Sequence, residues 1–156
     1  MNEEFKTKEI VSELVPHKGK MFLLNRVQSY SLETISITTE IDITREDLFY
    51  EEDLGGVPAW VAFEYMAQSI SALSGIYGRS RGEKPKVGFI MSVNSFKANV
   101  PVFKVGETVV VTVRQTIRMD MAVTFDGTAK VGETLAVSAT LNTVEVEDPK
   151  MALGLN

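Results

Sequence analysis

The hydrophobic pattern of the chain changes twice between its two ends. An apolar run at residues 21–27, followed by alternation of apolar and mostly polar positions at residues 35–43, predicts a strand, a turn and a second strand. Residues 44–56 carry an acidic turn and a Gly-Gly break, which predict a short helix or loop. Further strands are predicted at residues 87–93, 107–116, 121–130 and 134–146.

One long segment without β character separates these two groups of strands. It runs from Pro58 to about Tyr77 and is rich in Ala, Met and other helix formers, with a proline suited to the first helical turn. Apolar residues occupy nearly the whole circumference of this predicted helix, so we expect it to be buried on most sides. Strands grouped apart from a single helix predict an α+β fold, in which an antiparallel sheet wraps around that helix.

The domain organisation follows from the even spread of composition. The chain has 156 residues, of which 44% are hydrophobic and 24% charged, and no segment has the composition of a linker, a repeat or a low-complexity run. We therefore expect one domain over residues 1–156, with its core at about 13–146. The weak patterns at residues 1–13 and 147–156 predict mobile tails.

Composition and charge exclude several classes of site. The absence of cysteine excludes thiolate catalysis and cysteine-ligated metals, and a single histidine removes most other metal sites, so we expect neither a metal nor a cofactor. A net charge of −5 argues against bulk binding of nucleic acid. No window has the roughly 20 apolar residues of a membrane span, and the charged N-terminus is unlike a signal peptide, so the expected compartment is the cytoplasm.

Two side chains could carry acid–base chemistry. Glu64 lies inside the predicted buried helix, where desolvation favours the protonated form that a general acid needs. The alternative is a glutamate that reaches solvent or pairs with a basic residue. His17, in the turn sequence VPHKGKM, is the one ready-made base, although a surface or loop-packing histidine would look the same. Together they are a minimal set for removing a proton from carbon and delivering one to a leaving hydroxyl.

Three further features could support such a site. The start of the helix at Pro58 and Ala59 offers backbone N–H groups and the positive end of the helix dipole to a thioester oxygen. Gln68, one turn after Glu64, could orient the carboxyl group or simply bond to the edge of the sheet. A basic connector is typical of a solvated loop, but it could also dock an acidic partner through Arg79, Arg81, Lys84 and Lys86.

Three ordered motifs resemble one protein family. VPHKGKMFLLNRV, VPAWVAFEYMAQ and GFIMSVNSFKANVPVFKVGETVVV resemble segments of the hotdog-fold 3-hydroxyacyl-(acyl carrier protein) dehydratases, over roughly residues 13–146. The resemblance implies a hotdog fold and at least a dimer, with active sites at the subunit interface. It also matches Glu64 to the catalytic carboxylate, the Ala59 N–H to the amide that polarises the thioester, and Gln68 to the final glutamine of the helix motif.

One departure from that family concerns its catalytic histidine. The usual dehydratases carry it in a GHFPG segment just before the helix, whereas this chain reads FYEEDLGGVP, with Tyr50 nearest the vacant position. A retained PH turn with a lost GHFP histidine resembles the divergent dehydratase-like branch of aryl-polyene and related polyketide clusters. In that branch His17 would take over the role of the base.

These features together predict dehydration of 3-hydroxyacyl thioesters on an acyl carrier protein, in fatty acid, aryl-polyene or polyketide synthesis. His17 would remove the C2 proton, and protonated Glu64 would donate to the departing hydroxyl group. One alternative is a hotdog thioesterase in which Glu64 activates water. Another is a non-catalytic acyl-binding subunit that partners an active dehydratase, so a homodimer and a heterodimer both remain open.

Overall fold

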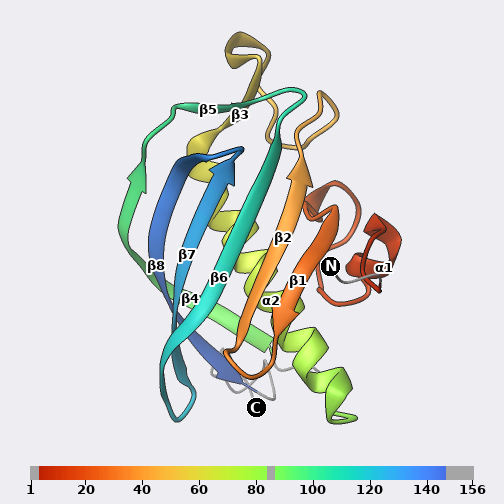
Figure 1. The fold of residues 1–156 in the computed structure, drawn as a ribbon, viewed down its shortest axis with the longest axis vertical. Helices are drawn as coiled ribbons and strands as arrows, with labels where there is room; N and C mark the ends of the chain where they lie inside the picture. The colour runs from red at the N-terminus through yellow and green to blue at the C-terminus, as the bar shows by residue number, and fades with distance from the viewer. Residues whose placement is uncertain (1–3, 84–86, 147–156) are drawn as a thin grey trace, which may run out of the picture.

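The fold is a six-stranded antiparallel sheet that curves around one long helix, α2 (Ala62–Ser80), in a computed structural model that describes residues 4–83 and 87–146 (Figure 1). This arrangement confirms the predicted α+β architecture. The strands, in their order across the sheet, are β1 (Arg26–Ser31), β2 (Ser36–Asp42), β6 (Thr108–Met119), β7 (Ala122–Val131), β8 (Thr134–Val146) and β4 (Val87–Ala98).

Smaller elements surround this core. The short strands β3 (Gly56–Pro58) and β5 (Val102–Lys104) pair with each other. The remaining elements are the helix α1 (Lys8–Ser12) and the single-turn 3-10 helices η1 (Gly19–Met21), η2 (Glu52–Leu54) and η3 (Ala59–Val61). Within the described ranges no helix combines the length and the apolar character that a membrane crossing requires.

The core lies between the concave face of the sheet and α2. Along β2 the buried side chains alternate with partly exposed ones, and Ile37, Thr39 and Ile41 point inward. β2 pairs with β6 so that Thr39 lies opposite Val111, and Val111 is fully buried. The apolar positions that alternate along this part of the sequence thus form the inward face of the sheet.

The central helix begins later than predicted. Pro58 is the last residue of β3 rather than the first of the helix, and the Ala59 N–H donates to Pro101 O at 3.0 Å. η3 follows, and the α-helical hydrogen bonds begin only at Ala62. The expected helix start at Pro58 was wrong, because Pro58 pairs with Val102 of β5 and is therefore part of a strand. The expected burial is confirmed, since residues 61–78 are all buried or partly buried.

Phe5 and Val11 lie in the core, whereas most other residues of the segment 4–13 are exposed. One prediction in the following segment was wrong. The first strand begins at Arg26, so most of the apolar run at residues 21–27 is not a strand. Phe22, Leu23 and Leu24 of that run are nevertheless buried, and Leu23 N–H donates to the Gln68 side chain instead of to a neighbouring strand. The predicted tail at residues 147–156 lies outside the described residues.

A glycine in α2 lets the N-terminal segment lie directly on the helix. A Cβ atom at Gly75 would stand 2.6 Å from the backbone oxygen of Leu14, closer than any side chain tolerates. The backbone that leads into the PH turn is therefore seated against α2. This contact places the turn beside the helix face that carries Glu64.

Candidate active site

The PH turn and the central helix bring the two predicted acid–base residues together. His17 Nε2 lies 3.5 Å from Glu64 Oε1, and the side chains are 28% and 24% exposed. This separation is longer than the 2.7–2.9 Å of a charge-assisted hydrogen bond. Both groups therefore stay available to a substrate while they remain neighbours.

Only one of the two ring nitrogens of His17 can take part in chemistry. Nδ1 is shielded from solvent and has no hydrogen-bond partner among the described residues, whereas Nε2 faces Glu64. A reacting proton can reach only a ring atom that a substrate can touch. The imidazole of His17 therefore presents Nε2 as its reactive atom.

Gln68 connects the turn to the helix. Its side chain is fully buried, and its Oε1 accepts from Leu23 N–H at 2.9 Å. Its Nε2 donates to Met21 O at 2.8 Å and to Glu64 Oε1 at 3.2 Å. One amide thus joins the segment after His17 to the carboxyl group of Glu64. Its backbone partners, Met21 and Leu23, precede β1, so the alternative contact of Gln68 with the edge of the sheet is not made.

A cavity of about 620 Å³ opens beside this pair. α2 contributes one of its faces, at the helical spacing of Glu64, Ala67, Ile70 and Ser74. The other walls are the segment around His17, two aromatic side chains and the edge of the sheet; their residues include Leu14, Val15, Phe63, Phe89, Ile90 and Thr143. Most of this lining is apolar, as expected for a site that binds an acyl group.

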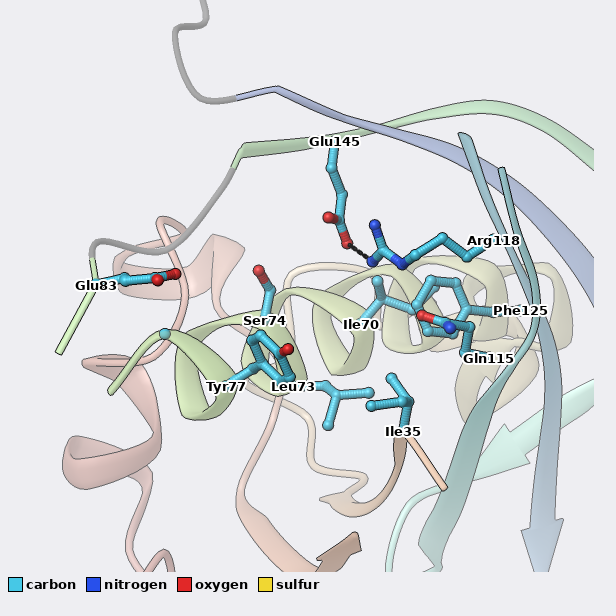
Figure 2. Close-up of a pocket in the computed structure, with 11 residues that line it drawn as sticks. Ile35, Ile70, Leu73, Ser74, Tyr77, Glu83, Gln115, Arg118, Phe125 and Glu145 are labelled. Atoms are coloured by element: carbon cyan, nitrogen blue, oxygen red, sulfur yellow. Dashed lines mark hydrogen bonds and ion pairs between the residues drawn. The ribbon is translucent and has the colours of Figure 1, made fainter. Parts of the chain in front are cut away.

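A second cavity of about 350 Å³ continues along the same helix face toward its C-terminal end (Figure 2). Ile70, Ser74 and Glu145 line both cavities, so the two adjoin. Arg118 pairs with Glu145 at 2.9 Å on its wall. Its extent could not be predicted from local patterns, because its walls come from α2 and from strands far along the chain.

The backbone donor predicted at the start of the helix is not free. The Ala59 N–H already donates to Pro101 O, so the expectation that it polarises a thioester oxygen is wrong for this arrangement of the chain. Tyr50, at the position of the lost histidine, does not line either cavity. Its hydroxyl donates to Glu52 at 2.9 Å, and this hydrogen bond raises the pKa of Tyr50.

Two of the predicted docking residues, Arg79 and Arg81, lie at the C-terminal end of α2. Arg79 pairs with Glu13 at 3.3 Å, and Glu13 lines the larger cavity. The Arg81 guanidinium lies 4.6 Å from the centre of the Tyr77 ring, and Tyr77 lines the second cavity. Lys84 and Lys86 lie outside the described residues.

The structure also shows features that the sequence reasoning missed. Trp60, which is 52% exposed, stacks against Phe63 and meets Phe49 edge-on, so an aromatic cluster borders the larger cavity. The small residues Ala67, Ser71 and Ser74 at helical spacing were the available signal for a cavity beside the helix. In residues 4–83 and 87–146 no three His, Asp or Glu side chains gather as metal ligands would.

Comparison with known proteins assigns the chain to a family. The ApeP-like family model, described as ApeP dehydratase, matches residues 9–154. No curated protein sequence is significantly similar to the chain.

Solved structures share the fold. The dehydratase heterocomplex ApeI:P from Xenorhabdus doucetiae has a chain with a TM-score of 0.83 and 25% identity, covering 94% of this chain and 97% of that one. Cj0977, a sigma28-regulated virulence protein from Campylobacter jejuni, has a TM-score of 0.67 and 12% identity, and the match covers 90% of this chain and 91% of that one. A hypothetical thioesterase with coenzyme A from Streptococcus pneumoniae has a TM-score of 0.61 and 9% identity, and the match covers 79% of this chain and 86% of that one. At their low identities the last two establish the fold alone, which is the hotdog fold predicted from the sequence.

Proposed function

The chain belongs to the ApeP-like family of dehydratases, and from the geometry of its cavity we propose that it removes water from 3-hydroxyacyl thioesters at the His17–Glu64 pair. The observation that carries the proposal is the 3.5 Å approach of Nε2 to the carboxyl group at the wall of a largely apolar cavity. An imidazole and a carboxyl group are the two groups that the elimination requires.

Each group moves one proton in the proposed reaction. His17 Nε2 takes the proton from C2, whose electron pair forms the C2=C3 double bond. The C3–O bond breaks, and the hydroxyl leaves as water with a proton from Glu64. Because Gln68 donates to Oε1 of Glu64, the proton of the neutral carboxyl group belongs on Oε2.

A second hotdog subunit is the proposed partner. β4 forms one edge of the sheet, and its exposed side chains include Met91 and Phe96, which are 67% and 37% exposed. An edge strand with unpaired backbone groups is suited to pairing with another chain. Gly88, Phe89 and Ile90 of β4 line the larger cavity, so a partner on this edge would border the His17–Glu64 site. The structural relative in a heterocomplex supports a related subunit as that partner.

An acyl carrier protein is the proposed donor of the substrate. Carriers are acidic, and the chain itself has a net charge of −5, so docking needs a local basic surface. Arg79 and Arg81 supply one at the end of α2, next to both cavities. Lys84 and Lys86 follow them in the sequence and complete the proposed docking set.

One competing function has an observation of its own. The segment that replaces GHFPG contains no histidine, and the relative with 25% identity is part of a heterocomplex. Both observations suit a non-catalytic subunit that binds the acyl group while its partner performs the elimination. The two functions differ in whether His17 and Glu64 are needed for turnover.

Mass spectrometry of a loaded carrier protein tests the proposal. The protein, alone and with a related hotdog subunit, is incubated with a 3-hydroxyacyl carrier, and loss of about 18 Da from the carrier reports dehydration. We expect His17→Gln and Glu64→Gln each to slow dehydration by at least about 100-fold, and Glu33→Gln, in an exposed turn, to leave it unchanged. Release of the whole acyl group would instead indicate a thioesterase.

The glutamine substitution at position 17 separates two roles of the histidine. Its amide can donate a hydrogen bond to Glu64 but cannot accept a proton. If His17→Gln stays active while His17→Asn does not, His17 only positions Glu64 and its assignment as the base is wrong. If the partner's turnover survives substitution of both His17 and Glu64, the non-catalytic subunit is the correct function.

A further inference from the structure

The proposed elimination needs the protons of the His17–Glu64 pair in particular places. Nε2 of His17 must be bare to take the proton from C2, so the single proton of the neutral imidazole must lie on Nδ1. Glu64 must carry a proton that it can give to the leaving hydroxyl group. The working pair therefore holds two protons, one on Nδ1 and one on the carboxyl group.

The surroundings of Nδ1 do not suit a proton at that atom. Nδ1 is shielded from solvent and meets no hydrogen-bond acceptor among the described residues. A buried N–H group without an acceptor is rarer in folded proteins than a buried acceptor without a donor, because the lone N–H loses its hydration and gains nothing in return. In this structure the imidazole proton therefore belongs on the other nitrogen, Nε2.

The surroundings of Nε2 lead to the same tautomer. The atom that faces it at 3.5 Å, Glu64 Oε1, already accepts from Gln68 Nε2 at 3.2 Å. The Gln68 amide cannot be reversed, because its oxygen accepts from Leu23 N–H. Oε1 thus presents lone pairs to the imidazole, which attract an Nε2–H group and repel a bare Nε2. A separation of 3.5 Å is too long for a firm hydrogen bond, but the sign of this interaction still favours Nε2–H.

Three carboxyl groups line the larger cavity, and two of them have a cation as partner. Glu13 pairs with Arg79 at 3.3 Å, and Glu145 pairs with Arg118 at 2.9 Å. Glu64 forms no ion pair with lysine or arginine in the described part of the chain. Its charge is therefore the least compensated of the three, and loss of water from the cavity would neutralise it first.

The lysine that follows His17 does not compensate this charge. Lys18 Nζ donates to Ser12 O at 2.9 Å and to Val15 O at 3.4 Å, so backbone carbonyls of the preceding segment hold the ammonium group. Glu64 thus faces one neutral amide, from Gln68, and the imidazole of His17.

We propose that the resting site holds one proton fewer than the working site, and that substrate binding is coupled to the uptake of one proton from solvent. This inference rests on the proposed function and adds the regulation of the same site. At rest His17 carries its proton on Nε2 and Glu64 is ionised. In the complex Glu64 gains a solvent proton on Oε2, and the imidazole proton moves from Nε2 to Nδ1.

The substrate itself drives this change. Its 3-hydroxyacyl group enters between Nε2 and Oε1, so the Nε2–H group no longer stabilises the carboxylate. The same group displaces water from a largely apolar cavity, which favours the neutral carboxyl group. Because Nδ1 has no acceptor in the resting structure, the PH turn must shift to supply one. The pair is thus inactive until a substrate occupies it.

The tautomer of His17 tests the resting state. His17 is the one histidine of the chain, so its two ring nitrogens give the only imidazole signals in nitrogen NMR of the labelled protein. At a pH where the ring is neutral, we expect the ratio of Nε2–H to Nδ1–H to be at least about five times that of the urea-unfolded chain, which is the matched control. A ratio no higher than that of the unfolded chain would overturn the proposed resting state.

Calorimetric titration counts the proton that is taken up. A stable 3-hydroxyacyl pantetheine amide is titrated into the protein, alone and with a related hotdog subunit, in buffers that differ in their enthalpy of ionisation. We expect uptake of about one proton per site for the unaltered protein and about none for Glu64→Gln, whose amide is neutral before binding. Glu145→Gln, which removes another carboxylate of the cavity wall, should leave the count unchanged.

These measurements do not depend on turnover. Binding without proton uptake, uptake that persists in Glu64→Gln, or no binding at all would overturn the proposed coupling. The dehydratase function would still stand if the loaded carrier loses water. Failure to dehydrate any thioester, in contrast, would refute the proposed function, while the tautomer and the proton count would still be measured.

Discussion

Replacing Gln68 by methionine should damage both the stability and the activity of this protein. The two side chains have similar length, but methionine can neither accept from Leu23 N–H nor donate to Met21 O and Glu64. The Leu23 amide is buried with its partner, so losing that partner costs about 1–3 kcal/mol. The Met21 carbonyl is less deeply buried and adds about 0.5–1 kcal/mol.

The free energy of unfolding should therefore fall by about 1.5–4 kcal/mol, measured by urea denaturation monitored by circular dichroism. For a chain of this size that loss corresponds to a decrease in Tm of about 3–16 °C. Gln28→Met is the matched control, because Gln28 makes one exposed hydrogen bond to Glu40, and we expect a change within about 0.5 kcal/mol. A loss below about 0.5 kcal/mol for Gln68→Met would refute the argument that this amide joins the turn to the helix.

Two further predictions concern stability. The Arg26 guanidinium, which donates to both carboxyl oxygens of Asp42, holds the pKa of Asp42 below its ordinary value. Their contribution to stability is thus present above the unfolded-state pKa of about 4 and is lost as the pH falls through the folded-state pKa, so Asp42→Asn should flatten the acid limb of Tm against pH. An unchanged limb would contradict this linkage. Gly75→Ala should cost about 1–3 kcal/mol in urea denaturation, because its Cβ would meet Leu14 O at 2.6 Å. At Gly88 an added Cβ would lie 4.0 Å from Val144 O, an ordinary contact, so Gly88→Ala should be close to neutral. Equal effects at both glycines would show that the N-terminal segment does not rest on the helix.

The candidate site shows how much a polar residue in an otherwise apolar helix indicates before the structure is known. A carboxyl group inside an apolar helix and a lone histidine in a proline-fixed turn were visible as chemistry before any distance was known. Their 3.5 Å approach was not, because 47 positions of chain separate His17 from Glu64 and only the packing of the PH turn on α2 decides where they meet. The sequence predicted that Gln68 lies beside Glu64 on one helix face, but it did not predict the contacts of Gln68 with Met21 and Leu23.

By itself, the sequence determined the class of fold and most of the elements, because hydrophobic periodicity is a local property. The alternation along β2 and the long apolar segment of α2 can each be recognised from the residues of that element alone. Tertiary structure decided where elements begin. Pro58 pairs with Val102 of β5 instead of opening the helix, and Phe22, Leu23 and Leu24 are buried although β1 begins only at Arg26. It also decided both cavities, because a cavity is formed by side chains from distant segments and belongs to none of them. Long-range packing therefore brings His17 and Glu64, which the sequence suggests only separately, together in one candidate site.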